Sequence, residues 1–257
     1  MWQNCFGTGI APTSDNLGYS GAEPSHPDLI DWLAFQFVDA GWSQKAVLRK
    51  ILMSRAFRQS SQSLRLGVET DPANRLLWRY PPLRLDAEAV RDAMLATAGT
   101  LDRKLGGAYI ASTRTPGGEV VVAEDDSKSR RRSLYLYQRR TQVVSLLQLF
   151  DAPQIVFNST RRPRSTIPLQ SLSLLNSEFA VLRARDLAER TARESASETQ
   201  RVALLWRLCF AREPRLEEAT EALEFLEQQV QEYREQSEPR LLAWRDLCQL
   251  LLASNEF

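Results

Sequence analysis

Apolar residues in the C-terminal half of the chain return every three or four positions, a spacing that places them on one face of an α-helix. Between these stretches the sequence becomes polar for a few residues, as it does where short connections join helices. The pattern predicts five successive helices, at residues 167–175, 177–194, 198–210, 215–235 and 238–253.

The N-terminal part shows the same periodicity in shorter stretches. Ser25 is placed to cap a helix that Gly41 ends, and Ser43 is placed to cap the next one. Asp86 is placed to cap a later helix that stops at Gly99. We therefore expect four helices in this part, at residues 27–40, 43–56, 71–78 and 87–98.

The helical period disappears in the middle of the chain. Residues 101–129 are rich in glycine and are expected to form a long surface loop or a subdomain boundary. The run from Ser133 to Tyr137 has the β-prone composition of a strand, and residues 141–150 return to a helical pattern, while 154–165 are irregular and basic. The predicted fold is mainly α, a compact multi-helix domain with a small β element near 133–137. We expect one domain over 1–257, with a subdivision into 1–108, 109–128 and 129–257.

Composition adds little to this expectation. The chain has 257 residues, of which 43% are hydrophobic and 25% are charged, and its net charge is only +1. These values are typical of a globular protein with a sizeable core, and they disfavour a disordered chain. No apolar run approaches the length of a membrane span, and residues 1–20 lack the pattern of a signal peptide.

Charge is distributed unevenly along the chain. Residues 128–164 contain eight arginines and one lysine but a single acid, Asp151. Such a density of like charge calls for counter-charges or for an anionic ligand. We therefore expect an anion-binding surface, whose candidate residues are Arg131, Arg132, Arg139, Arg140, Arg161, Arg162, Arg164, Ser165 and Thr166.

Two simpler explanations stand beside this one. Residues 186–257 contain fifteen acids and nine arginines, so acids of the C-terminal helices could neutralise the basic segment. The chain also has 29 arginines and only four lysines, an excess that a GC-rich genome produces without any function. An arginine still differs from a lysine, because its planar guanidinium binds a carboxylate, phosphate or sulfate through two hydrogen bonds.

Residues suited to most catalytic and metal chemistry are scarce. His26 is the only histidine, and Cys5, Cys209 and Cys248 are far apart in the sequence. Zinc, iron and haem sites draw on several imidazoles or thiolates, so we expect no metal and no haem in this chain. The sequence contains neither a phosphate-binding glycine loop nor a nucleophile-elbow motif, and Glu124 with its two acidic neighbours is expected to form a solvated loop.

A series of short motifs, in a fixed order, carries a family resemblance. They are Trp2-Gln3, Phe6-Gly7-x-Gly9, the segments 25–34, 41–43 and 54–61, Asp71-Pro72-x-Asn74-x-Leu76-Leu77, 84–88 with Arg91-Asp92, Arg131-Arg132-Ser133, Phe150-Asp151-x-Pro153, the segment 162–170, Leu175-Asn176 and 253–257. In this order they resemble the domain of unknown function 1553, the C-terminal domain of large proteins that also carry planctomycete-type cytochrome c domains. The likeness extends over essentially the whole chain, with Ala108 standing where the family commonly has proline.

The resemblance implies context rather than chemistry. It supplies no activity, substrate or catalytic residue. It implies an exported or periplasmic multidomain protein whose c-type haem lies in a separate upstream domain, and upstream domains that act as partners of this one. It also implies that residues 1–257 are part of a longer protein.

Two functions from different classes remain open. The first is a non-catalytic binding or scaffold module, whose arginine-rich surface meets an acidic partner domain or a sulfated or uronic polysaccharide. The second is an enzyme domain acting on an anionic polysaccharide or a redox substrate, with carboxylates as acid and base and arginines holding anionic groups. The scarcity of histidine and cysteine favours the first. The near-neutral net charge disfavours nucleic-acid binding, although basic and aromatic residues alternate between 132 and 140.

Overall fold

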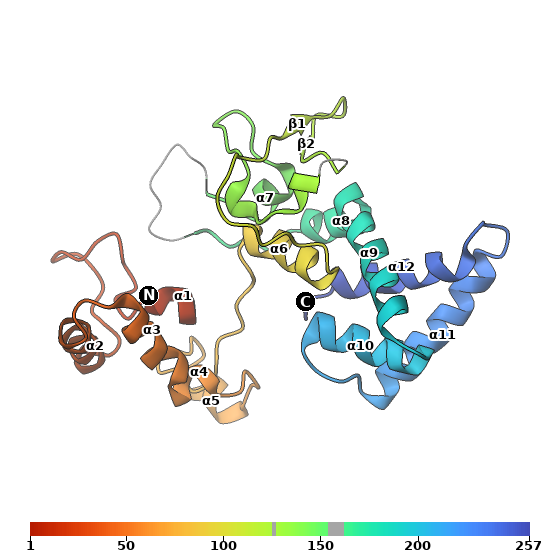
Figure 1. Ribbon diagram of the computed structural model, residues 1–257. Coiled ribbons are helices and arrows are strands. Elements are labelled where there is room, and N and C mark those ends of the chain that lie inside the picture. Colours follow the sequence, from red (N-terminus) through yellow and green to blue (C-terminus); the bar gives the residue numbers. More distant parts are fainter. Residues whose placement is uncertain (125–126, 154–161) are drawn as a thin grey trace. The chain divides into compact units, whose positions relative to one another are not determined.

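The computed structural model describes residues 1–124, 127–153 and 162–257 of the chain (Figure 1). The chain divides into two compact units, Met1–Arg84 and Leu85–Phe257. Across the described residues there are twelve α-helices and one two-stranded antiparallel sheet, so the predicted mainly α fold with a small β element is confirmed. The predicted single domain, with a subdivision at residue 108, stays a prediction.

The first unit contains five short helices. They are α1 (Trp2–Phe6), α2 (Pro27–Asp39), α3 (Gln44–Met53), α4 (Arg55–Arg58) and α5 (Arg65–Thr70). As expected, the Ser43 hydroxyl accepts a hydrogen bond from the Ala46 amide and caps α3. A small core forms where Cys5 and Phe6 of α1 pack against Val47 and Ile51 of α3.

Three expectations for this unit are wrong. The helix expected at 43–56 ends at Met53, and Ser54 caps the separate helix α4. His26, not Ser25, occupies the N-cap position of α2. Residues 71–78 form turns rather than a helix, because the Asp71 carboxylate accepts hydrogen bonds from the amides of Arg75 and Leu76. Leu77 also has a positive φ of 55°, which a continuous right-handed helix excludes.

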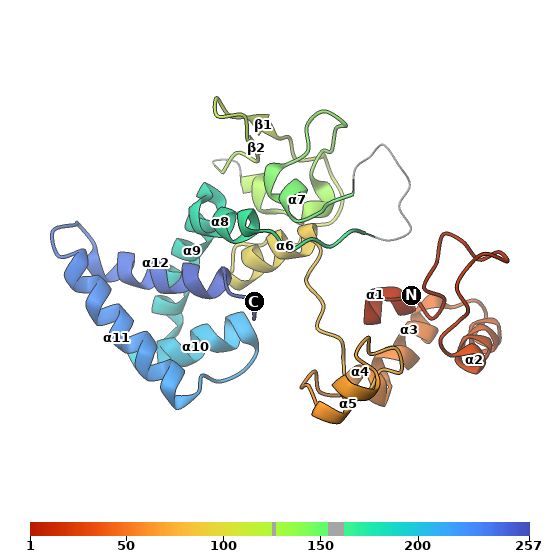
Figure 2. The same cartoon turned by 180° about the vertical axis from the view of Figure 1, so that it is seen from behind.

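The second unit contains the longer helices, and Figure 1 and Figure 2 show α11 and α12 meeting at the loop that joins them. Its members are α6 (Ala87–Thr97), α7 (Ser145–Leu149), α8 (Pro168–Asn176), α9 (Glu178–Glu194), α10 (Glu198–Phe210), α11 (Leu216–Glu232) and α12 (Pro239–Leu252). Helix α12 packs against both α9 and α11. The five C-terminal helices therefore match the five predicted from the apolar spacing, to within a few residues at each end.

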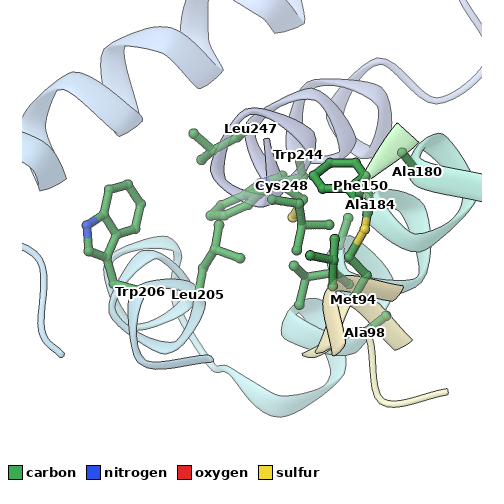
Figure 3. Packing of buried hydrophobic residues seen from close by; sticks show 14 of the residues in the cluster. Met94, Ala98, Phe150, Ala180, Ala184, Leu205, Trp206, Trp244, Leu247 and Cys248 are labelled. Carbon is green, nitrogen blue, oxygen red and sulfur yellow. The ribbon is translucent and has the colours of Figure 1, made fainter. Parts of the chain in front are cut away.

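The core of the second unit gathers apolar faces from helices that are distant in the sequence (Figure 3). Met94 of α6, Ala184 of α9, Leu205 of α10 and Trp244 of α12 are all fully buried or almost so. Cys248 lies in this core as a free thiol, and Cys209 packs beside it, also free. Their role is thus that of small buried hydrophobic residues.

The β structure lies elsewhere than expected. Strand β1 (Thr113–Arg114) pairs with β2 (Val120–Val121) inside the segment predicted to be a loop. The predicted strand at Ser133–Tyr137 is wrong, because residues 133–135 form the 3-10 helix η2 (Ser133–Tyr135) and only Leu136 makes a β-bridge, with Ile110. A second 3-10 helix, η1 (Ser127–Arg130), comes just before it.

A hydrogen bond from outside the segment explains this difference. The Asp92 carboxylate of α6 accepts hydrogen bonds from both the amide and the hydroxyl of Ser133. The Ser133 amide therefore cannot join a β ladder. The segment therefore forms the 3-10 helix η2, held against α6, instead of the predicted strand.

Candidate functional site

The arginine-rich segment is attached to α6 through a buried arginine. Arg91 is only 2% exposed, and its guanidinium donates hydrogen bonds to the backbone carbonyls of Ser129 and Arg131 and to the hydroxyl of Ser133. Burial lowers the pKa of Arg91 to about 10, although the nearby Asp92 and Glu124 carboxylates oppose this effect. Arg91 therefore fixes the course of residues 129–133.

A second buried arginine lies close to the first. Arg183 of α9 is also 2% exposed and forms ion pairs with Glu124 and Asp186, each at 3.0 Å. Both guanidiniums also lie near the Phe179 ring, that of Arg91 at 5.4 Å and that of Arg183 at 5.3 Å from the ring centre. Glu124 is thus a structural ion-pair partner rather than part of a solvated loop.

The sequence contains a sign of both buried arginines that the prediction overlooked. Arg91 falls on the apolar stripe of α6 between Val90 and Met94, and Arg183 falls beside Ala184 on the stripe of α9. A charged residue on a buried helix face needs a partner, because an unpaired buried charge is costly. Both positions could therefore have been singled out from the helical pattern alone.

Arg131 turns into the protein. It is 5% exposed, donates hydrogen bonds to the backbone carbonyls of Gly106 and Ala108, and lies 3.9 Å from the centre of the Tyr135 ring. These contacts hold the glycine-rich loop around Gly107 in place. The Arg131 guanidinium therefore already contacts carbonyl oxygens and an aromatic ring, and it does not face solvent as an anion-binding group would.

Arg132 and Arg162 line the same cleft, at the N-terminal end of α6. Its volume is about 580 Å³, and it is also lined by Asp86, Glu88 and Asp92. Arg162 donates to both oxygens of Glu88, at 2.5 and 3.3 Å, and these hydrogen bonds raise the pKa of Arg162. Carboxylates therefore outnumber guanidiniums in this cleft, which we call the α6 cleft.

Of the other candidates between residues 161 and 166, two have protein partners, one is exposed and one lies outside the described residues. Arg164 is 3.9 Å from Asp86, and the Ser165 amide and hydroxyl both donate to the Asp151 carboxylate, at 2.7 and 2.8 Å. Thr166 is exposed, two residues before α8 begins. Arg161 lies outside the described residues. The structure thus brings Arg132 and Arg162 to one cleft and gives Ser165 an acidic partner.

Arg139 and Arg140 lie on a different surface. The rings of Tyr109 and Tyr137 stack with centroids 4.6 Å apart, and the Arg139 guanidinium lies 4.8 Å from the centre of the Tyr137 ring. Arg114 joins them, because it donates a hydrogen bond to the Thr141 carbonyl at 3.4 Å. We call this group, with the exposed Arg140 that follows Arg139 in the chain, the tyrosine–arginine surface; it consists of Tyr109, Arg114, Tyr137, Arg139 and Arg140.

Two properties distinguish this surface from the α6 cleft. Its aromatic rings are accessible, since Tyr109 is 61% exposed and Tyr137 is 39% exposed. In the described part of the chain, none of its three arginines forms an ion pair with a carboxylate, whereas Arg162 and Arg164 both do. The surface therefore combines free positive charge with exposed aromatic faces.

The acids of the C-terminal helices are occupied mainly by arginines of the same region. Arg212 pairs with Glu218 at 2.7 Å and with Glu256 at 2.6 Å, and its hydrogen bonds lower the pKa of Glu218 to about 2. Arg185 pairs with Glu189 at 3.2 Å. For Arg162 and Arg164, the counter-charges come from the start of α6 and not from the C-terminal helices.

The described residues contain no group of three or more histidine, cysteine or acidic side chains arranged to hold a metal ion. The only histidine, His26, shares a hydrogen bond with the Ser25 hydroxyl at 2.9 Å. Within the same residues, no helix has the length and apolar character needed to cross a membrane. The expected absence of metal and haem from the chain stays a prediction.

The sequence comparison decides the family. The model of the family described as PSD1, protein of unknown function (DUF1553), matches residues 1–226. The chain belongs to the DUF1553 family. The match ends inside α11, and it includes the α6 cleft and the tyrosine–arginine surface. No curated protein and no solved structure matches the chain. The DUF1553 family has no stated activity, so function has to be argued from the surface itself.

Proposed function

We propose that this member of the DUF1553 family is a non-catalytic binding module that holds a polyanion on its tyrosine–arginine surface. The observation that carries the proposal is the exposed pair of tyrosine rings with Arg139 stacked beside them. An exposed aromatic pair contributes nothing to the core, and its rings offer apolar faces to a ligand.

The chemistry of this surface fits a sulfated or uronic polysaccharide. The apolar face of a sugar ring can stack on Tyr109 or Tyr137, and a sulfate or carboxylate can accept two hydrogen bonds from one guanidinium. Arg114, Arg139 and Arg140 supply guanidiniums that no described carboxylate neutralises. A polyanion would relieve the repulsion among these three charges.

An acidic partner domain would use the same charges. The expected upstream domains of an exported, cytochrome-bearing protein are one source of such a partner. An acidic protein surface would depend on the arginines but much less on the tyrosine rings. Substitution of the tyrosines therefore separates the two kinds of ligand.

The test measures binding of the 257-residue protein to dextran sulfate and to polygalacturonate, with neutral dextran as the reference. We expect saturable binding to the two anionic polymers that weakens steeply as sodium chloride rises. Arg139→Ala with Arg140→Ala, and separately Tyr109→Ala, should each weaken it about tenfold, or about 1.4 kcal/mol. The matched control is Arg207→Ala with Arg234→Ala, which removes the same charge from exposed positions on α10 and just after α11.

The comparison with the control decides the proposal. Equal weakening by both double variants would mean that only net charge matters and would leave the surface without a specific role. Loss of binding in the arginine variant but not in Tyr109→Ala would point to an acidic protein partner instead.

An enzyme domain is the second candidate, and the α6 cleft favours it. Asp86, Glu88 and Asp92 face a cleft of about 580 Å³ together with Arg132 and Arg162, the residue types that cleavage of an anionic polysaccharide would use. Against it, Glu88 and Asp92 already accept hydrogen bonds from Arg162 and Ser133. Release of reducing ends from polygalacturonate that disappears in Asp92→Asn, at unchanged folding, would establish this candidate.

A further inference from the structure

A third group of arginines lies in a recess between the C-terminal end of α6 and the face of α9. Its volume is about 320 Å³, at the lower end of the range of ligand pockets, which is roughly 300–1,000 Å³. Its charged lining consists of Arg103, Arg190, Arg193 and one acid, Glu194. None of these residues belongs to the α6 cleft or to the tyrosine–arginine surface.

Arg190 is held rigidly at the back of this recess. Its Nη1 donates hydrogen bonds to the carbonyls of Ala96 and Thr97, at 3.3 and 2.8 Å, and its Nε donates to Glu194 at 3.0 Å. Gly99 allows this close approach, since its φ is +76° and a Cβ there would lie 3.0 Å from the Arg190 Cδ. The Nη2 group of Arg190 has no partner among the described residues and remains available to a ligand.

The other two arginines have no counter-charge. Arg103 and Arg193 are exposed, and within the described part of the chain neither forms an ion pair. Glu194, the one acid of the recess, is already paired with Arg190. Like charges that share a small recess repel each other, so an anion bound between them would be favoured.

We propose that this recess binds the oxyanion head group of a phosphate or sulfate ester. Guanidiniums offer pairs of parallel N–H donors that match the oxygens of a tetrahedral oxyanion. The preset Arg190 provides one anchor, and Arg103 and Arg193, which line the same recess, supply further donors. The volume of the recess, about 320 Å³, matches an anion that carries a single small organic group.

Binding is measured on the 257-residue protein by calorimetry and by thermal unfolding, at constant ionic strength set with sodium chloride. The probes are inorganic phosphate, inorganic sulfate, glucose 6-phosphate and glucose 6-sulfate. We expect saturable stabilisation by at least one of them, and at least tenfold weaker binding in Arg103→Gln with Arg193→Gln. Tighter binding of a sugar ester than of its inorganic anion would mean that the recess also binds the organic group. Tighter binding of the inorganic anion would mean that the free anion is the ligand.

The same variant gives a second readout in the absence of any anion. Because it relieves repulsion and breaks no described ion pair, Arg103→Gln with Arg193→Gln should melt at the same temperature as the parent or higher. The control, Arg207→Gln with Arg234→Gln, should bind the probe as the parent does. Equal stabilisation of the parent and the recess variant by every probe would overturn the proposal, as would a lower melting temperature of the anion-free variant.

This site and the tyrosine–arginine surface are tested by different variants. The recess variant should keep its affinity for dextran sulfate, and Arg139→Ala with Arg140→Ala should keep its affinity for the small esters. Either proposal can therefore fail while the other stands.

Discussion

Replacement of Arg91 by methionine tests how the arginine-rich segment is held. Methionine resembles the arginine side chain in its unbranched apolar stem but has no charge and no donor. Arg91 donates to the carbonyls of Ser129 and Arg131 and to the hydroxyl of Ser133, and all three of these residues are at most 5% exposed. After the change, these buried acceptors lose their donor and water has little access to them.

The size of the effect follows from these contacts. A buried polar group left without a partner costs about 1–3 kcal/mol. Removal of Arg91 also removes the cost of burying its charge, a cost that lowers its pKa to about 10. Three such acceptors would cost about 3–9 kcal/mol together, and relief of the burial cost brings the expected net loss to about 4 kcal/mol. At about 2–4 °C per kcal/mol for a unit of this size, the melting temperature should fall by about 8–16 °C.

The assay combines urea unfolding with amide hydrogen exchange. Urea unfolding measures the free energy, and exchange at residues 129–136 measures whether the segment opens locally before the unit unfolds. The matched control is Arg185→Met on α9, whose side chain is 53% exposed and pairs with Glu189. An exposed pair contributes about 0–1 kcal/mol, so the control should be nearly neutral.

Two results would refute this reasoning. One is an Arg91→Met protein as stable as the parent, which would mean that desolvation of the guanidinium outweighs its hydrogen bonds. The other is unchanged exchange at 129–136 despite a loss of stability, which would mean that Arg91 acts on the core alone. If Arg91→Met does not fold, Arg91→Lys retains the charge and should show an intermediate loss of the same kind.

Three further predictions concern other parts of the chain. The pKa of Glu218 is lowered by Arg212, so its contribution is present above the unfolded value of 4.5 and is lost as the pH falls toward about 2. Arg212→Ala should therefore flatten the dependence of unfolding free energy on pH between 5 and 2, as followed by urea titration. Gly67→Ala would place a Cβ against the Trp78 ring. Overpacking of this kind costs about 1–3 kcal/mol and should outweigh the gain of about 1 kcal/mol in helix propensity. The free energy of unfolding, followed by tryptophan fluorescence, should therefore fall. Burial raises the pKa of Cys209 to about 12, so this thiol should react with Ellman's reagent at pH 8 only after unfolding, and rapid reaction of the native protein would contradict the packing.

The helices were the most predictable part of the molecule. The ends of α9 and α10 agree with the prediction to within one residue, because their caps and apolar faces are set by neighbours three or four positions away. The segments 71–78 and 133–137 were predicted wrongly for a shared reason. In each segment, an aspartate carboxylate accepts a hydrogen bond from a backbone amide that the predicted helix or strand needed for its own hydrogen bonds. Asp71 does so from within its segment, and Asp92 does so from α6.

The candidate site was only partly predictable. Clustering in the sequence placed Arg131, Arg132 and Arg162 in one group, but Arg131 is buried against backbone carbonyls and the other two line the α6 cleft. Basic and aromatic residues alternate between 132 and 140, a stretch that includes Tyr137, but nothing in the sequence pairs Tyr137 with Tyr109, which falls in the segment expected to be a loop. Their stacking depends on two segments meeting across the Ile110 and Leu136 bridge.

The sequence by itself determined the mainly α class, the positions of the C-terminal helices and the family. The helical pattern marks Arg91 and Arg183 as buried, but tertiary structure alone decided which partners they meet and which of the other arginines are free to bind. The physical reason is distance along the chain. Helical periodicity acts over three or four residues, whereas the contact between Arg91 and Ser133 spans 42 residues and that between Arg162 and Glu88 spans 74. A guanidinium has the same charge in every setting, and only the folded chain determines whether it meets a carbonyl, a carboxylate or solvent.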